Sequence, residues 1–162
     1  MSKTTTPKGF SGVLELLKKY NQGTAGLSTP TIDFLSDVGK ETIEGMFQSK
    51  FPGNDLYNQR DAFGYGIYFN GKLVKEGYLD GELSKAPSKH RKQRGREEAK
   101  KAISQYTPLT DGYELYLVNA MHYSRAQEEF WGVPVLVDSE VFEAQRKIED
   151  KLKIRVKVTF EH

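Results

Sequence analysis

The sequence predicts an α+β fold in which N-terminal helices and further packed helices lie against a mixed or antiparallel sheet of about four strands. The strongest observation is an aromatic β-hairpin over residues 62–79, turning at Asn70-Gly71. A second is the strict alternation of apolar and polar residues from Ile154 to Phe160. A third is the helical spacing of apolar residues between Thr29 and Lys50.

Length and composition limit the classes of protein that this chain can belong to. Its 162 residues suit a tail over residues 1–9 and a single α+β domain over residues 10–162. The net charge of +2 is too small for nucleic-acid binding by the whole molecule, and the absence of Cys excludes disulfides and thiolate chemistry. Neither a signal peptide nor an apolar run of about 20 residues is present, so we expect no secretion by that route and no membrane span.

The N-terminal half shows two helical patterns and the hairpin. Apolar residues recur at helical spacing from Phe10 to Tyr20, with Ser11 as a plausible N-cap, which predicts a short amphipathic helix. A second helix is expected with Thr29 as its cap and Pro30 at its first position, and it should extend to Lys50. In the hairpin that follows, alternate residues of the first strand would share one face: Phe63, Tyr65, Ile67 and Phe69.

The C-terminal half alternates helices and strands. We expect a helix over residues 97–106, a strand over 113–118 and a short helix over 122–130. The extension 133–162 should contain a helix capped by Asp138 or Ser139, with a Glu149–Lys153 pair, and then the alternating strand 154–160.

No residue pattern indicates catalysis, a metal or a cofactor. The three histidines, His90, His122 and His162, have no second histidine at metal-ligand spacing. Paired acids such as Glu128 and Glu129, with Asp61 or Glu114, are more typical of a solvated helix face than of an acid–base pair. Ser124 lacks a nucleophile elbow, and the glycines of Gly64-Tyr65-Gly66 fit close packing over a strand better than phosphate binding. We therefore expect a protein that is not an enzyme and uses no cofactor.

A basic segment between the hairpin and the next helix leaves two interpretations open. It can be a solvated loop, or it can contact DNA phosphates or an acidic partner. It contains no aromatic residue for stacking, which disfavours base reading of single strands. Its cationic residues, within the loop 84–96, are Lys85, Lys89, Arg91, Lys92, Arg94 and Arg96.

Two segments together resemble the neck and tail-completion proteins, the head-to-tail joining proteins of tailed bacteriophages. Residues 55–68, Asp-Leu-Tyr-Asn-Gln-Arg-Asp-Ala-Phe-Gly-Tyr-Gly-Ile-Tyr, are similar to the entry into that family's aromatic hairpin. Residues 113–128, Tyr-Glu-Leu-Tyr-Leu-Val-Asn-Ala-Met-His-Tyr-Ser-Arg-Ala-Gln-Glu, are similar to its strand, Asn, Tyr-Ala and Leu-Glu pattern. The resemblance covers about residues 30–130, and the order of elements also agrees with the family.

The resemblance implies a structural virion protein, made in the cytoplasm of the bacterial host, that forms or joins a ring at the portal–tail junction. Its partners would be copies of itself, portal or adaptor proteins and tail proteins, with double-stranded DNA in the channel. Head-to-tail contacts close into a ring when the rotation between subunits permits. Aromatic residues are the candidate interface anchors, with core packing as the alternative for each. They are Tyr116, Tyr123, Phe130 and Trp131. The other hypothesis is a small nucleic-acid-binding accessory protein that acts through the loop 84–96.

Overall fold

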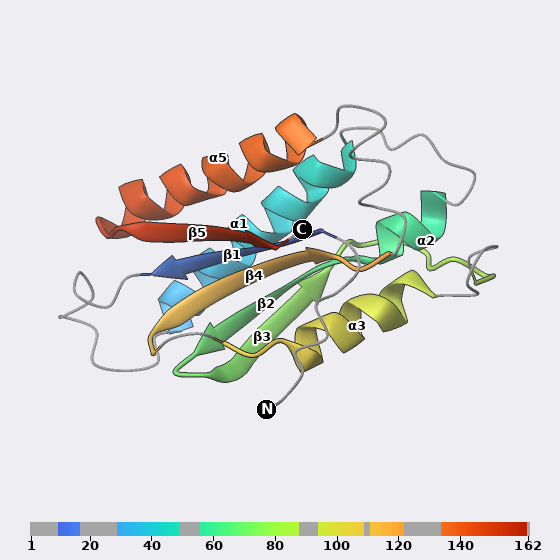
Figure 1. Ribbon diagram of the computed structural model, residues 1–162, viewed down its shortest axis with the longest axis horizontal. Helices are drawn as coiled ribbons and strands as arrows, with labels where there is room; N and C mark the ends of the chain where they lie inside the picture. Colours follow the sequence, from blue (N-terminus) through green and yellow to red (C-terminus); the bar gives the residue numbers. More distant parts are fainter. Residues whose placement is uncertain are drawn as a thin grey trace.

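A computed structural model describes residues 10–16, 29–48, 56–87, 94–108, 111–121 and 134–161 of the chain. Within these ranges the fold is α+β, as the sequence predicts (Figure 1). The strands are β1 (Phe10–Leu16), β2 (Phe63–Phe69), β3 (Lys72–Tyr78), β4 (Tyr113–Asn119) and β5 (Val156–Glu161). The helices are α1 (Thr29–Gln48), α2 (Leu56–Asp61), α3 (Gly95–Gln105) and α5 (Pro134–Leu152).

The five strands form one sheet in the order β3-β2-β4-β1-β5. Every neighbouring pair is antiparallel. The sheet therefore has one strand more than the four that the sequence indicates, because β1 joins it between β4 and β5.

The helix expected from Phe10 to Tyr20 is wrong over its described part, since residues 10–16 form β1. Leu14 and Leu16 are buried on one face of this strand, and Ser11 and Val13 are buried on the other. A strand that is buried on both faces loses the apolar–polar alternation that identifies a half-buried strand. Its apolar residues then happen to fall at helical spacing, and Ser11 is a strand residue, not a helix cap.

The aromatic hairpin is confirmed. Asn70 and Gly71 have φ values of 48° and 80°, the positive values that a two-residue hairpin turn requires. The tip is held to the start of β4, because the Gly112 backbone N–H donates to Asn70 Oδ1 at 2.8 Å. The four alternate residues of β2 named in the sequence analysis all lie in, or pack against, one hydrophobic cluster.

That cluster lies between the sheet and the helices α1 and α5, which contact each other (Figure 1). Tyr65 of β2 fits between two glycines, Gly39 of α1 and Gly77 of β3. Its hydroxyl group forms a buried hydrogen bond of 2.6 Å with Ser36 Oγ of α1. The bond fixes both the distance and the rotation of α1 over β2.

The opposite face of β2 receives α3. Gly64 and Gly66 present no side chain there, and an added Cβ atom would lie 3.2 and 3.0 Å from atoms of Ile103 of α3. Tyr68, on the same face, donates from its hydroxyl to the Ile103 carbonyl oxygen. The close packing over the glycines that the sequence suggests is confirmed, and burial raises the pKa of Tyr68 well above its ordinary value.

The remaining boundaries differ from the expectations by a few residues. Helix α1 begins one residue earlier than expected, at Thr29, and α3 begins two residues earlier than expected, at Gly95. Helix α5 begins at Pro134, so Asp138 and Ser139 lie inside the helix and do not cap it. The short helix expected over residues 122–130 falls outside the described residues.

Both outer strands of the sheet carry features that oppose pairing with a further strand. In β3 the register shifts opposite Ile67 and Tyr68, and such a bulge interrupts the regular spacing of outward backbone groups. In β5 the Val156 N–H donates to Glu149 Oε1 at 3.0 Å, and the Val156 carbonyl accepts from Gln145 Nε2 at 3.0 Å. Side chains of α5 thus occupy the backbone groups at the start of β5.

Two glycines of α1 should respond in opposite ways to replacement by alanine. A Cβ on Gly39 would lie 2.8 Å from Tyr65 Cγ, and this ring cannot move away because Ser36 and Gly77 confine it. We expect Gly39→Ala to lower the free energy of unfolding by about 1–3 kcal/mol.

Gly45→Ala is the matched control in the same helix. The atoms nearest to its Cβ would be those of the Glu140 carboxylate, the far end of a flexible side chain, so the higher helix propensity of alanine should raise stability by up to about 1 kcal/mol. Urea denaturation of both variants measures the two effects. Equal destabilisation by the two substitutions would show that Tyr65 does not set the approach of α1.

Candidate functional site

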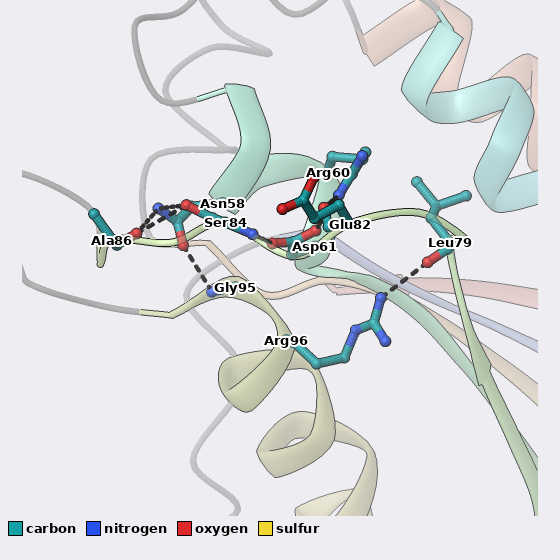
Figure 2. A network of polar contacts seen from close by, with 9 residues as sticks. All are labelled: Asn58, Arg60, Asp61, Leu79, Glu82, Ser84, Ala86, Gly95 and Arg96. Carbon is teal, nitrogen blue, oxygen red and sulfur yellow. Dashed lines mark hydrogen bonds and ion pairs between the residues drawn. The ribbon is translucent and has the colours of Figure 1, made fainter.

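The two flanks of the basic segment meet at a network of polar contacts around α2 (Figure 2). Asp61, at the end of α2, is 3% exposed. Its carboxylate accepts the Ser84 backbone N–H at 2.7 Å and pairs with Arg60 at 3.0 Å. Arg60 in turn donates to the Glu82 carbonyl oxygen. These contacts attach the residues that follow β3 to α2.

Asn58 joins the two flanks through a single amide. Its Nδ2 donates to the Ala86 carbonyl oxygen at 2.8 Å, and its Oδ1 accepts the Gly95 N–H at 3.3 Å. Gly95 is required here, because a Cβ at this position would collide with the backbone carbonyl of Asn58. The ends of the stretch from Ala86 to Gly95 are therefore held by one side chain (Figure 2).

The Arg96 side chain makes contacts within the fold. One of its terminal nitrogens donates to the Leu79 carbonyl oxygen at 2.9 Å, and its guanidinium lies 4.6 Å from the centre of the Tyr78 ring. Burial is the main cause that raises the pKa of Tyr78, and Glu76 adds to it. A guanidinium in this position joins α3 to β3 and does not face solvent as a free phosphate ligand would.

The other cationic residues of the segment differ in their surroundings. The Lys85 side chain is 88% exposed and forms an ion pair with Glu82 at 3.5 Å, whereas Arg94 is exposed before α3. Lys89, Arg91 and Lys92 lie outside the described residues. The described part of the segment thus resembles a solvated loop with fixed ends more than a continuous cationic surface.

Tyr116 is the only candidate interface anchor within the described residues, and it is 1% exposed. Its ring stacks on Tyr106 with centroids 4.3 Å apart and 9° between the ring planes. Core packing, the alternative that the sequence analysis kept for each anchor, is thus what the structure shows for Tyr116. Tyr123, Phe130 and Trp131 lie outside the described residues.

The acidic residues considered for catalysis have structural contacts. Asp61 is held by the α2 network, and Glu114, which is buried, accepts the Tyr106 hydroxyl at 2.8 Å. Within the described ranges no group of three His, Cys, Asp or Glu side chains could hold a metal ion. No described helix combines the length and the apolar character that a bilayer span requires.

Asn119 fixes a local turn with its side chain. Its Oδ1 accepts the Met121 N–H at 3.2 Å, where the chain leaves β4. The contacts of Asn58, by contrast, were missed by the sequence analysis. The available signal was an Asn-x-x-Asp pair on one short helix before a strand, which is too common to identify a network.

Comparison of the chain with protein-family models, with curated proteins and with solved structures found no match. The fold and the motifs of the chain itself are therefore the basis for assigning a function.

Replacing Asn58 by alanine should release both flanks of the segment. We expect Asn58→Ala to lower the free energy of unfolding by about 2 kcal/mol, because the buried Gly95 N–H and the Ala86 carbonyl oxygen both lose their hydrogen bonds to the Asn58 amide. Amide hydrogen exchange at Gly95 should also accelerate. Ser84→Ala is the comparison, since it removes the hydroxyl that accepts a bond from Asn58 Nδ2 at 3.2 Å but leaves the bonds of the Asn58 amide to Ala86 and Gly95 intact, so its effect should be smaller. Unchanged stability and exchange in Asn58→Ala would contradict this role.

Proposed function

We propose that this chain is a structural subunit of the neck of a tailed bacteriophage, which forms or joins a ring at the portal–tail junction and helps to complete the head and attach the tail. The two segments that resemble the head-to-tail joining family are separated by more than forty residues between β2 and β4. The observation that carries the proposal is that they are adjacent in the fold.

Strand β2 of the first segment pairs along its whole length with β4 of the second, from Phe63 opposite Asn119 to Phe69 opposite Tyr113. The Ala120 N–H also donates to the Ala62 carbonyl oxygen at 3.2 Å, beyond the end of the paired strands. Motif residues that meet in one place are better evidence for a shared architecture than the same residues scattered over the molecule. The proposal is therefore supported by the pairing of the two motif strands, and not by either motif alone.

The geometry also favours one kind of contact between copies. Because the bulge in β3 and the α5 side chains at β5 oppose strand addition, ring contacts should use side-chain surfaces and not an extended sheet. With Tyr116 inside the core, the anchors that remain are Tyr123, Phe130 and Trp131. The partners of the ring would be portal or adaptor and tail proteins.

Nucleic-acid binding through the loop 84–96 receives less support. Of its three described cations, Arg96 is bonded to the Leu79 carbonyl and Lys85 is paired with Glu82. The loop retains a place in the ring hypothesis as a surface that faces channel DNA or an acidic portal surface.

Native mass spectrometry of the purified chain, at low and moderate salt, tests the ring. We expect a discrete closed multimer without DNA, and we expect Trp131→Ala and Tyr123→Ala to shift it towards monomer. Phe142→Ala is the matched control, because this exposed ring of α5 lies against Phe160 of β5 and is not among the proposed anchors. A chain that remains monomeric at every concentration, alone and with portal protein, would refute the proposal.

A further inference from the structure

The end of α5 and the start of β5 carry a second concentration of positive charge, which the sequence analysis did not identify. Between residues 150 and 157 four cationic side chains stand against one carboxylate, that of Asp150. All four are exposed: Lys151, Lys153, Arg155 and Lys157. They are called the C-terminal basic patch here.

The fold arranges these cations on the outside of the molecule. Ile154 and Val156 are buried, and Arg155 and Lys157, which alternate with them, are exposed as the chain enters β5. Lys153 has a φ of 54° and ends α5, with its N–H donated to the Glu149 carbonyl oxygen at 2.9 Å. This sharp turn brings the helix end and the strand start, with their cations, into one region.

The carboxylate expected to neutralise the patch is directed elsewhere. The sequence predicts a Glu149–Lys153 pair, but Glu149 Oε1 instead accepts bonds from Gln145 Nε2 and from the Val156 N–H. Glu15 lies opposite Lys157 by strand register and does not form an ion pair with it. No described residue forms an ion pair with Lys151, Lys153 or Lys157.

We propose that the C-terminal basic patch binds the phosphate backbone of double-stranded DNA. The exposed large hydrophobic residues among those described are Leu73, Leu83 and Phe142, and none of them lies in the patch. A protein interface needs apolar or aromatic anchors at its centre, whereas phosphate contacts need only cations. The absence of a stacking aromatic within residues 150–157 also separates this surface from single-strand binding sites.

Two local roles account for part of the patch and not for all of it. Lys151 lies in the last turn of α5, where a cation favours the negative end of the helix dipole. Lys157 lies on an outer strand, where lysine discourages strand addition. Neither role accounts for the exposed cations Lys153 and Arg155, which lie between Lys151 and Lys157 in the sequence. The patch also lies at the opposite end of the sheet from α2 and the start of α3, so it is separate from the loop 84–96 (Figure 1).

The test is fluorescence anisotropy of the full chain with a labelled DNA duplex over a series of salt concentrations. The variant Lys151→Gln/Lys153→Gly/Lys157→Gln removes three charges, and glycine suits the positive φ at position 153. We expect binding on the order of 10-fold weaker at moderate salt, and a salt slope reduced by about 2.7 for three lost phosphate contacts. Circular dichroism verifies that the variant is folded.

Two controls make the test specific. Lys72→Gln/Lys100→Gln/Lys101→Gln removes the same number of exposed lysine charges elsewhere and should leave the slope unchanged. Charge reversal at Arg91, Lys92 and Arg94 should also leave the salt slope unchanged. A loss of affinity only in this last variant, equal losses in all three, or patch-dependent binding of poly-glutamate without binding of duplex would each overturn the proposal. So would a wild-type chain that binds no duplex at low salt.

Discussion

The alternation of large side chains and glycine along β2 determines how both helical layers approach the sheet. Towards α1 the strand presents Phe63, Tyr65 and Ile67, and towards α3 it presents Gly64 and Gly66. The rings fill the wide space under α1, whereas the missing side chains let α3 lie close to the strand. Because β2 also pairs with both β3 and β4, its position sets the register of the aromatic half of the sheet.

The elements that could be predicted are those whose signal is local. The Asn70-Gly71 turn, the start of a helix near Thr29 and Pro30, and the alternation before Phe160 each depend on a few neighbouring residues, and each is found in the structure. Strand β1 could not be predicted, because its burial on both faces comes from strands far away in the sequence. The early start of α5 at Pro134 was missed because Asp138 and Ser139 are equally good caps on local grounds.

The candidate site also combines features that are visible in the sequence with features that depend on distant contacts. That residues 84–96 are basic is visible in the sequence, but the inward use of Arg96 depends on Leu79 and Tyr78, which the hairpin brings to it. The contacts of Asn58 with Ala86 and Gly95 likewise exist only once α2 and α3 lie together. At the other end of the sheet, the free charge of Lys153 depends on the hydrogen bonds that Glu149 makes with β5. The sequence shows how many charged side chains a segment has, and the tertiary contacts determine which of them face solvent.

The interruptions at the two edges of the sheet have a consequence for proteins that gather in many copies. A sheet with open edges offers the same backbone template to every neighbour, so crowding favours fibres that grow without limit. Here the bulge in β3 and the Gln145 and Glu149 contacts at Val156 interrupt or occupy that template in the folded monomer. Contacts between copies at high local concentration then depend on the shape and charge of side-chain surfaces. Such contacts fix the angle between neighbouring copies. A fixed angle limits how many copies an assembly can hold.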